Sequence, residues 1–198
     1  RLLDMTYAFS VFANNGTMLG TPKRPQDVMP GYRQLDPVSI LQVNNARGEE
    51  IYRYLQPERR DVLSPQVAYL ITHVLSDNVA RTPAFGSVNS LILPDRPVAA
   101  KTGTTNDYHD GWTVGFTPQF VTAIWTGNTN HDPMAEGAAG IRTAGPLWQR
   151  IMTYLHEGKP VEQFVRPEGI VSATVDAVSG KLPTEYTPST REEIFIVG

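Results

Sequence analysis

Apolar residues recur at helical spacing in three segments of this chain. The first ends at Asn14-Asn15-Gly16, where the glycine can take the left-handed conformation that closes a helix, so we predict a helix over residues 1–15. The second begins at Ser64-Pro65, a capping serine followed by a proline suited to the first helical position. The third, residues 146–155, is amphipathic and is followed by Gly158. In the second helix the spacing predicts one core-facing side, made of Val67, Leu70, Ile71, Val74 and Leu75.

Between residues 97 and 127 the pattern changes to a period of two, which is typical of strands. Three such stretches are present, at residues 98–104, 112–116 and 120–126. Their joins are short and contain turn residues, so we predict three consecutive antiparallel strands as the centre of the chain. The helix over residues 146–155 can lie across this sheet.

Weaker strand signals lie outside this centre. Residues 39–43 and 51–55 flank Asn45-Ala46-Arg47-Gly48 and predict a peripheral hairpin. After Pro160 the chain holds one predicted strand, residues 170–175, among turn residues. We expect this tail to be an appendage or a bridge to a following domain.

Composition narrows the possible functions. The 198 residues, of which 40% are hydrophobic, can form one good-sized core or two small ones. A net charge of -3 without a basic run argues against nucleic acid as a partner. The absence of cysteine excludes a disulfide framework, a thiolate zinc site and a cysteine nucleophile. No apolar run approaches the roughly 18 residues of a membrane span, and no signal peptide is evident. Because the chain begins with Arg1, we expect it to be excised from a longer protein.

The segment Lys101-Thr102-Gly103-Thr104-Thr105 carries the clearest chemistry. On a pleated strand, Lys101 and Gly103 face one side, and the two threonines that alternate with them face the other. An edge strand would offer unpaired backbone groups to an extended peptide, while the ammonium group attracts a carboxylate and the hydroxyls donate hydrogen bonds. Taken alone, a K-T-G tripeptide is better explained as a solvated strand end with a surface lysine.

The rest of the sequence favours a functional role for this segment over a solvated strand end. Stretches that resemble segments of one protein family follow one another along nearly the whole chain, at residues 13–16, 100–107, 110–118, 124–127, 146–148, 164–170 and 193–198. Their order resembles the later transpeptidase segment of class A, bifunctional penicillin-binding proteins, for which K-T-G is a signature element. The resemblance implies an α/β domain of the α+β type, an antiparallel sheet flanked by helices, as part of a penicillin-binding transpeptidase or serine β-lactamase-like fold. It assigns residues 1–159 to the C-terminal portion of the transpeptidase domain and residues 160–198 to a C-terminal extension with a short strand.

The resemblance also implies an activity. Such proteins are serine D,D-transpeptidases that cross-link peptidoglycan stem peptides and are acylated by β-lactams. The parent protein would lie at the extracytoplasmic face of the bacterial plasma membrane, anchored by an upstream segment, with an upstream glycosyltransferase domain. Its expected partners are the stem peptide, β-lactams and the upstream part of the same protein. Neither a cofactor nor a metal is expected.

The family's site residues map onto the K-T-G segment. Lys101 corresponds to the lysine that helps to hold the carboxylate of the substrate or antibiotic. The backbone N–H of Thr104 would be one half of an oxyanion hole, a feature that stabilises transition states by several kcal/mol in hydrolases. The full set of expected substrate-binding residues is Lys101, Thr102, Gly103, Thr104 and Thr105.

The nucleophile that this chemistry requires is absent from the chain. Family enzymes use a serine and a lysine in S-x-x-K, yet the residues three before the four lysines are Gly20, Val98, His156 and Val178. We therefore expect the fragment alone to be inactive. Ser76-Asp77-Asn78 and Ser87-Val88-Asn89 match the family's S-x-N as text, but they lie just before K-T-G rather than far upstream. We interpret the first as the polar end of a helix over residues 65–79 and the second as a loop.

Other chemistry-bearing residues favour structural roles. His109-Asp110 and His131-Asp132 lie in predicted loops without the third ligand that a zinc site needs. Hydrolase and phosphate-binding readings fail because the chain has neither G-x-S-x-G nor a glycine-rich loop before Lys101. The three tryptophans are interpreted as core residues. Residues 106–109 either rim the active-site groove or form a plain turn.

Two alternatives compete with the transpeptidase. A noncatalytic binding or structural module derived from such a domain would account for the missing nucleophile. A β-lactamase or sensor relative shares K-T-G, but it fits the tryptophan-containing strands and the long tail less well. An upstream reading frame with S-x-x-K, S-x-N and a glycosyltransferase domain would favour the transpeptidase. In either case we expect the isolated fragment to self-associate, because its first helix and its sheet would expose apolar surface.

Overall fold

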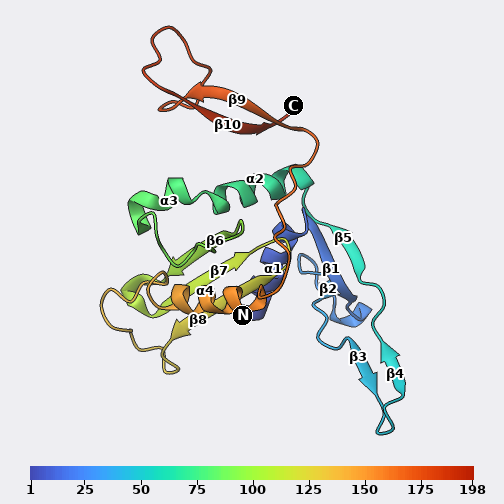
Figure 1. Ribbon diagram of the computed structural model, residues 1–198. Helices are drawn as coiled ribbons and strands as arrows, with labels where there is room; N and C mark the ends of the chain where they lie inside the picture. The colour runs from blue at the N-terminus through green and yellow to red at the C-terminus, as the bar shows by residue number, and fades with distance from the viewer.

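The computed structural model describes residues 1–198 and is centred on a three-stranded antiparallel sheet (Figure 1). The strands are β6 (Ala99–Thr104), β7 (Asp110–Phe116) and β8 (Val121–Gly127), in the order β6-β7-β8. The register pairs Gly103 with Trp112 and Gly115 with Thr122. The predicted meander is confirmed, and its order leaves β6 at an edge of the sheet.

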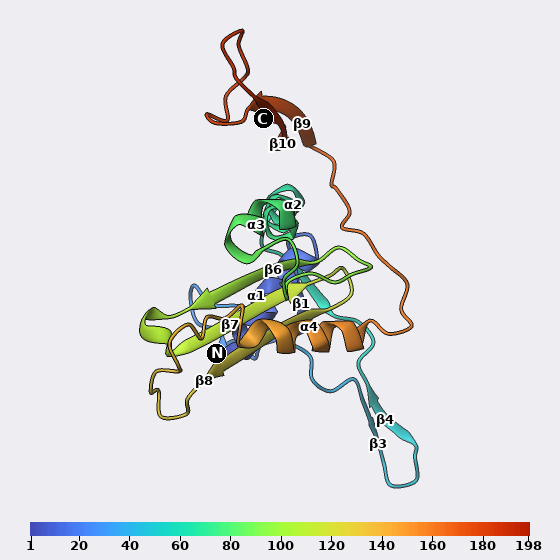
Figure 2. The ribbon, with the colours of Figure 1, turned by 60° about the vertical axis from the view of Figure 1, so that its left-hand side comes forward.

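Helices cover both faces of this sheet (Figure 2). The helix α1 (Leu2–Ala13) packs against β7 and β8 on one face, and α4 (Ala144–Leu155) packs against the same strands on the other. On β7, Phe116 contacts the α1 side through the rings of Phe9 and Phe12, with centroids 6.4 Å away in both cases. The neighbouring Gly115 faces α4, where an added Cβ would lie 2.4 Å from the ring of Trp148. Both helices were predicted, as was the position of α4 across the sheet.

The main core lies between α4 and the sheet. Trp148 is fully buried there, and its indole N–H donates to the carbonyl of Thr122 at 3.1 Å. The buried residues that surround it are Leu91, Leu93, Val98, Ala100 and Met152. The whole chain nevertheless exposes 12944 Å², whereas a folded monomer of this length exposes about 9,300 Å². Much of the chain is therefore covered poorly by its own residues.

The helix α2 (Pro65–Ser76) begins as predicted, since Oγ of Ser64 accepts a hydrogen bond of 3.3 Å from the amide of Val67. Its predicted core side is wrong for three of the five residues, whereas Leu70 and Leu75 are half-buried. Ala68 and Thr72 are buried, while Val67, Ile71 and Val74 are exposed. The helix approaches α1 and β6 closely through small residues, and the hydroxyl of Thr72 is satisfied by donating to the carbonyl of Ala68 at 2.9 Å.

The predicted helix over residues 65–79 is also divided in two. It ends at Ser76, and Asp77 caps a second helix, α3 (Asn78–Phe85), by accepting a hydrogen bond of 2.9 Å from the amide of Ala80. Aspartate is among the preferred capping residues, which explains why a new helix starts there.

Two further sheets lie at the periphery (Figure 1). The first has the order β2-β1-β5, and the second is a projecting hairpin of β3 and β4, which confirms the predicted peripheral hairpin. A short 3₁₀ helix, η1 (Pro25–Asp27), follows β1. The strands are β1 (Thr17–Pro22), β2 (Leu35–Asp36), β3 (Gln42–Asn44), β4 (Glu50–Arg53) and β5 (Glu58–Asp61).

The tail forms a hairpin of its own that stands away from the central sheet (Figures 1 and 2). The predicted strand is present as β9 (Ile170–Asp176), and it pairs along its whole length with β10 (Thr190–Ile196), which the sequence pattern did not indicate. Gln66 of α2 donates a hydrogen bond of 2.8 Å to the carbonyl of Glu168 beside this hairpin. None of the helices has the length and apolar character that a bilayer crossing requires.

Candidate active site

The K-T-G residues lie on the open edge of the central sheet. The amide of Thr105 donates 3.1 Å to the carbonyl of Asp110, so the backbone of residue 105 points toward β7. Backbone direction alternates along an antiparallel strand, and the N–H and C=O groups of Thr102 and Thr104 therefore point outward, away from β7. The Thr104 amide that was expected to serve an oxyanion hole is free for such a contact.

Lys101 projects from the face of the sheet that α1 covers. Cross-strand partners share a face, and Lys101 is paired with Val114. Its side chain is exposed, and its ammonium group donates a hydrogen bond to the carbonyl of Thr102 at the open edge. It forms no ion pair, so its positive charge is available to a carboxylate from outside the chain.

The hydroxyl groups of the motif have different surroundings. Thr104 accepts a hydrogen bond of 3.0 Å from the amide of Gly140, which leaves its own hydroxyl proton free to donate. Thr102 lies on the same face of the sheet, opposite Thr113. Thr105 is engaged in the turn, because its Oγ1 accepts from the amide of Asp110 at 2.8 Å and donates to the carboxylate of that residue at 3.1 Å.

A strained turn follows the motif. Asp107 and Tyr108, in the short helix η2 (Asn106–Tyr108), both have φ of 57°, a left-handed conformation that is uncommon outside glycine and that often marks functional sites. Tyr108 lines a cavity of about 670 Å³ together with Arg142, so these residues form a turn and also border a hollow. Beside the turn, the indole N–H of Trp125 donates a hydrogen bond of 2.7 Å to the carboxylate of Asp110. Because its side chain is partly exposed, the expectation of a core position is wrong for this tryptophan.

A groove runs between the open edge of β6 and the junction of α2 with α3. Its volume is about 310 Å³, within the range of small-ligand sites. Its lining includes Lys101 and Thr102 from the edge strand, Leu75 from α2, and Arg81 and Phe85 from α3. Sequence patterns did not single out Arg81, because it lies in a helix that the periodicity did not separate from α2.

The asparagines of the two S-x-N strings bond to each other, and the first string lies at the junction of α2 with α3 rather than at the end of one helix. Nδ2 of Asn89 donates 3.0 Å to Oδ1 of Asn78, and Nδ2 of Asn78 donates 3.1 Å to the carbonyl of Ser87. These bonds tie the start of α3 to the loop before β6. The amide groups of both strings are thus used within the fold.

The two loop histidines lie side by side. The rings of His109 and His131 stack with centroids 4.6 Å apart, and Nδ1 of His109 lies 2.6 Å from the carbonyl oxygen of His131. No three histidine or acidic side chains gather in a way that could hold a metal ion. The buried His156 lies elsewhere, with Nε2 2.9 Å from Oγ1 of Thr117 and Nδ1 2.6 Å from the carbonyl of Met152.

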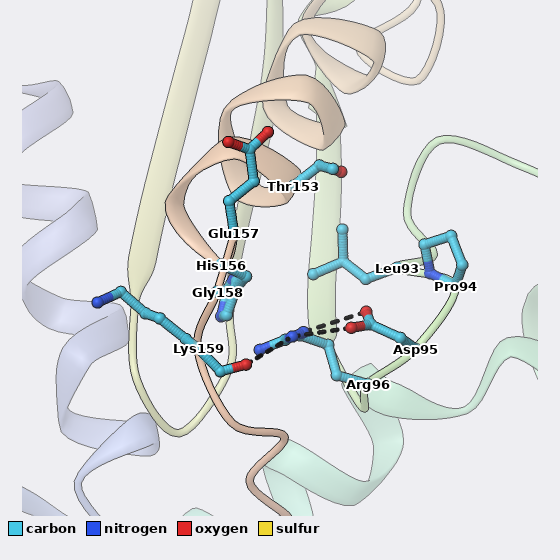
Figure 3. A pocket seen from close by; sticks show the side chains of 9 residues that line it. All are labelled: Leu93, Pro94, Asp95, Arg96, Thr153, His156, Glu157, Gly158 and Lys159. Atoms are coloured by element: carbon cyan, nitrogen blue, oxygen red, sulfur yellow. Dashed lines mark hydrogen bonds and ion pairs between the residues drawn. The ribbon is translucent and has the colours of Figure 1, made fainter.

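A second cavity, of about 360 Å³, lies between the segment that precedes β6 and the C-terminal end of α4 (Figure 3). The guanidinium group of Arg96 lines this cavity. It donates a hydrogen bond of 2.8 Å to the carboxylate of Asp95 and hydrogen bonds of 3.4 Å to the carbonyls of Lys159 and Pro160. The hydrogen bond from Arg96 lowers the pKa of the Asp95 carboxyl from its ordinary value. Because Arg96 and Asp95 pair with each other, we interpret these contacts as an anchor for the tail after α4 rather than as a ligand-binding site.

Two protein-family models match this chain. The family model described as "Penicillin binding protein transpeptidase domain" matches residues 2–153, and the model described as "Penicillin-binding protein 1A, C-terminal domain" matches residues 166–198. Penicillin-binding protein 1A of Pseudomonas aeruginosa is 33% identical over 134 residues, which are 68% of this chain and 16% of that protein.

Solved structures give the same fold. The crystal structure of penicillin-binding protein 1A from Haemophilus influenzae matches 100% of this chain and 32% of its own, with a TM-score of 0.76 and 23% identity. The D,D-transpeptidase domain of a peptidoglycan glycosyltransferase from Eggerthella lenta matches 77% of this chain and 32% of its own, with a TM-score of 0.52 and 23% identity. The mixed helix and antiparallel sheet architecture expected from the sequence is thereby confirmed. The chain spans only a part of each of these proteins.

Proposed function

The chain belongs to the penicillin-binding protein transpeptidase family, and from this premise we propose that it supplies one half of the active site of a serine D,D-transpeptidase. That enzyme would cross-link peptidoglycan stem peptides and react with β-lactams. We assign residues 1–159 to the C-terminal portion of the transpeptidase domain and residues 160–198 to a C-terminal extension. The observation that carries the proposal is the open edge of β6, where an unpaired lysine and an outward-pointing backbone amide lie on one strand.

Each residue of the edge has a role in this proposal. Lys101 attracts the terminal carboxylate of the stem peptide, or the carboxylate of a β-lactam, and Thr102 adds a hydroxyl donor. The backbone of Gly103 lets the ligand approach closely, since no side chain projects there. When a serine attacks the substrate carbonyl, the oxygen gains negative charge, and the N–H of Thr104 donates to it. The Thr105 hydroxyl stabilises the turn that ends the strand.

The serine and its lysine would come from residues of the parent protein that precede this chain. The Eggerthella lenta structure is titled as a D,D-transpeptidase domain of a peptidoglycan glycosyltransferase, which supports a parent protein with both activities. We place such a protein at the extracytoplasmic face of the plasma membrane, where peptidoglycan is assembled. The chain alone has no S-x-x-K and would not form an acyl-enzyme.

Covalent labelling with a fluorescent penicillin tests this function. The parent protein should be labelled, the label should be lost when the serine of its S-x-x-K is replaced by alanine, and the isolated 198-residue chain should stay unlabelled. Labelling that survives removal of that serine would refute the mechanism. A parent protein without S-x-x-K would instead favour the noncatalytic module, for which the absence of a nucleophile from this chain is the supporting observation.

A further inference from the structure

Arg81 has an unusual environment in the groove beside the K-T-G strand. It belongs to the first turn of α3, and its guanidinium reaches back to the C-terminal end of α2. Nη2 donates to the carbonyl of Leu75, and Nε donates 3.3 Å to the carbonyl of Asp77. The first contact satisfies a carbonyl in the last turn of α2, which the end of the helix leaves without a partner. The third nitrogen, Nη1, is buried and has no partner, the one side-chain atom of the chain in this condition.

The positive charge of Arg81 is also without a partner. No carboxylate pairs with it, and the nearby Asp77 uses its carboxylate to cap α3. Burial lowers the pKa of the Arg81 guanidinium, and the Asp77 charge opposes this only in part. A buried donor without an acceptor costs free energy, more so when it is charged. An acceptor that enters from outside the chain would remove this cost.

The groove offers such an acceptor a place to bind. Arg81 and Lys101 both line it, and neither forms an ion pair. The one acidic side chain in the lining, Asp77, is engaged in capping α3. Most of the remaining wall is apolar, formed by residues such as Val74, Phe85 and Leu91. The outward-pointing backbone of Thr102 lies along the same edge. This combination suits a short extended peptide end with small apolar side chains and a terminal carboxylate.

We propose that Arg81 is a second carboxylate-binding residue, which shares with Lys101 the terminal carboxylate of the stem peptide or the carboxylate of a β-lactam. The inference rests on the transpeptidase function proposed above. Contacts to the carbonyls of Leu75 and Asp77 hold the guanidinium in place, so Nη1 can serve the ligand with little loss of conformational entropy. Arg81 would then determine preference for acidic over esterified ligands.

The test compares benzylpenicillin with its methyl ester on the parent protein. Second-order acylation rates would be followed by intact mass, with ester concentrations raised until the unmodified protein reacts measurably. We expect Arg81→Gln to slow acylation by the free acid at least tenfold and to leave the rate with the ester within twofold. The rate at which Arg81→Lys is acylated by the free acid should lie between those of the unmodified protein and of Arg81→Gln, because lysine keeps the charge and loses the planar guanidinium group. Arg47→Gln, at the exposed tip of the β3–β4 hairpin, is the matched control and should change neither rate.

The outcomes separate the two proposals. An equal slowing for acid and ester would mean that Arg81 only caps α2, and no slowing would mean that it takes no part in ligand binding; either result overturns the inference. If the unmodified parent protein is acylated by neither compound, the transpeptidase function itself fails. Thermal unfolding of each variant, measured beside the rates, reports the loss of the α2 cap separately.

Discussion

The amide of Gly140 donates a hydrogen bond of 3.0 Å to Oγ1 of Thr104. The two residues are 36 positions apart, and the bond joins the loop before α4 to the K-T-G strand. A Cβ at Gly140 would lie 2.5 Å from the carbonyl oxygens of Gly103 and Trp112, so the loop backbone lies directly on the β6–β7 pair. This contact fixes the threonine whose backbone amide we propose for the oxyanion hole.

Gly140→Ala should therefore disturb the site. The added methyl group meets backbone atoms that cannot rotate away, so the loop or the strand must shift. We expect penicillin acylation of the parent protein to slow at least tenfold and stability to fall by about 1–3 kcal/mol. Stopped-flow labelling and urea unfolding measure the two effects. Gly198→Ala, where an added Cβ meets nothing within 4 Å, is the control. Unchanged kinetics in Gly140→Ala would refute a role for this loop in shaping the edge.

Lys101→Gln should lower reactivity without lowering stability. The ammonium group is exposed and makes no ion pair, so the fold loses little, while a carboxylate ligand loses its positive partner. We expect acylation by benzylpenicillin to slow about 10- to 100-fold, which is about 1.4–2.7 kcal/mol. The deficit should shrink at high salt, because exposed charges are screened. Lys181→Gln, in the exposed tail, serves as the control. A variant that reacts at the original rate would exclude Lys101 from carboxylate binding.

Trp148→Ala should destabilise the domain strongly. The side chain is fully buried between α4 and the sheet, and its N–H is bonded to Thr122. Truncation of a buried tryptophan typically costs about 3–5 kcal/mol, and denaturant unfolding measures it. Trp125→Ala is the comparison, since this partly exposed side chain should cost less. Similar losses for both variants would contradict the assignment of the core to the α4 face.

The tail hairpin should loosen in acid through Asp176. Hydrogen bonds from the amides of Ser179 (2.7 Å) and Val178 (2.9 Å) lower the pKa of this carboxyl below its ordinary value. A carboxyl whose folded-state pKa is lowered stabilises the fold above its unfolded pKa, about 3.9, and this stabilisation is lost as pH falls through the folded value. The protection of the β9 and β10 amides, expressed relative to the intrinsic exchange rate at each pH, should therefore fall below about pH 4.

The matching variant for this titration is Asp176→Asn, which should remove the acid-dependent part of the change. Glu185→Gln, in the exposed connection of the same hairpin, should leave it intact. Nuclear magnetic resonance can follow both the carboxyl titration and the exchange rates. Protection factors that stay constant as the pH is lowered through this range would contradict the stabilising role of Asp176.

The isolated chain should self-associate. The outer side of α2 exposes Val67, Ile71 and Val74 by 38%, 39% and 69%, and α1 exposes Leu3 by 61%. These surfaces add to an accessible area well above that of a compact monomer, and exposed apolar patches favour association. Light scattering should detect oligomers that Val74→Lys reduces and that Val178→Lys, at the tail tip, does not. A monodisperse monomer at high concentration would refute the prediction.

The sequence by itself determined those features that depend on neighbours along the chain. Alternation with short joins predicts the β6-β7-β8 meander because an apolar side chain on every second residue suits one face of a strand. Ser64-Pro65 predicts the start of α2 because a cap needs only residues within one turn. The K-T-G segment and the ordered stretches around it indicated the family, because each is a contiguous run of residues.

Only the tertiary structure decided features that depend on distant residues. Helical spacing marked Val67 and Val74 as core, yet α2 packs through Ala68 and Thr72, since the partner surface admits only small side chains at close approach. The placement of Gly140 over Gly103 depends on how α4 docks on the sheet. The unpaired Nη1 of Arg81 beside Lys101 arises only when α3 folds back toward the edge strand, and no local pattern carries that information.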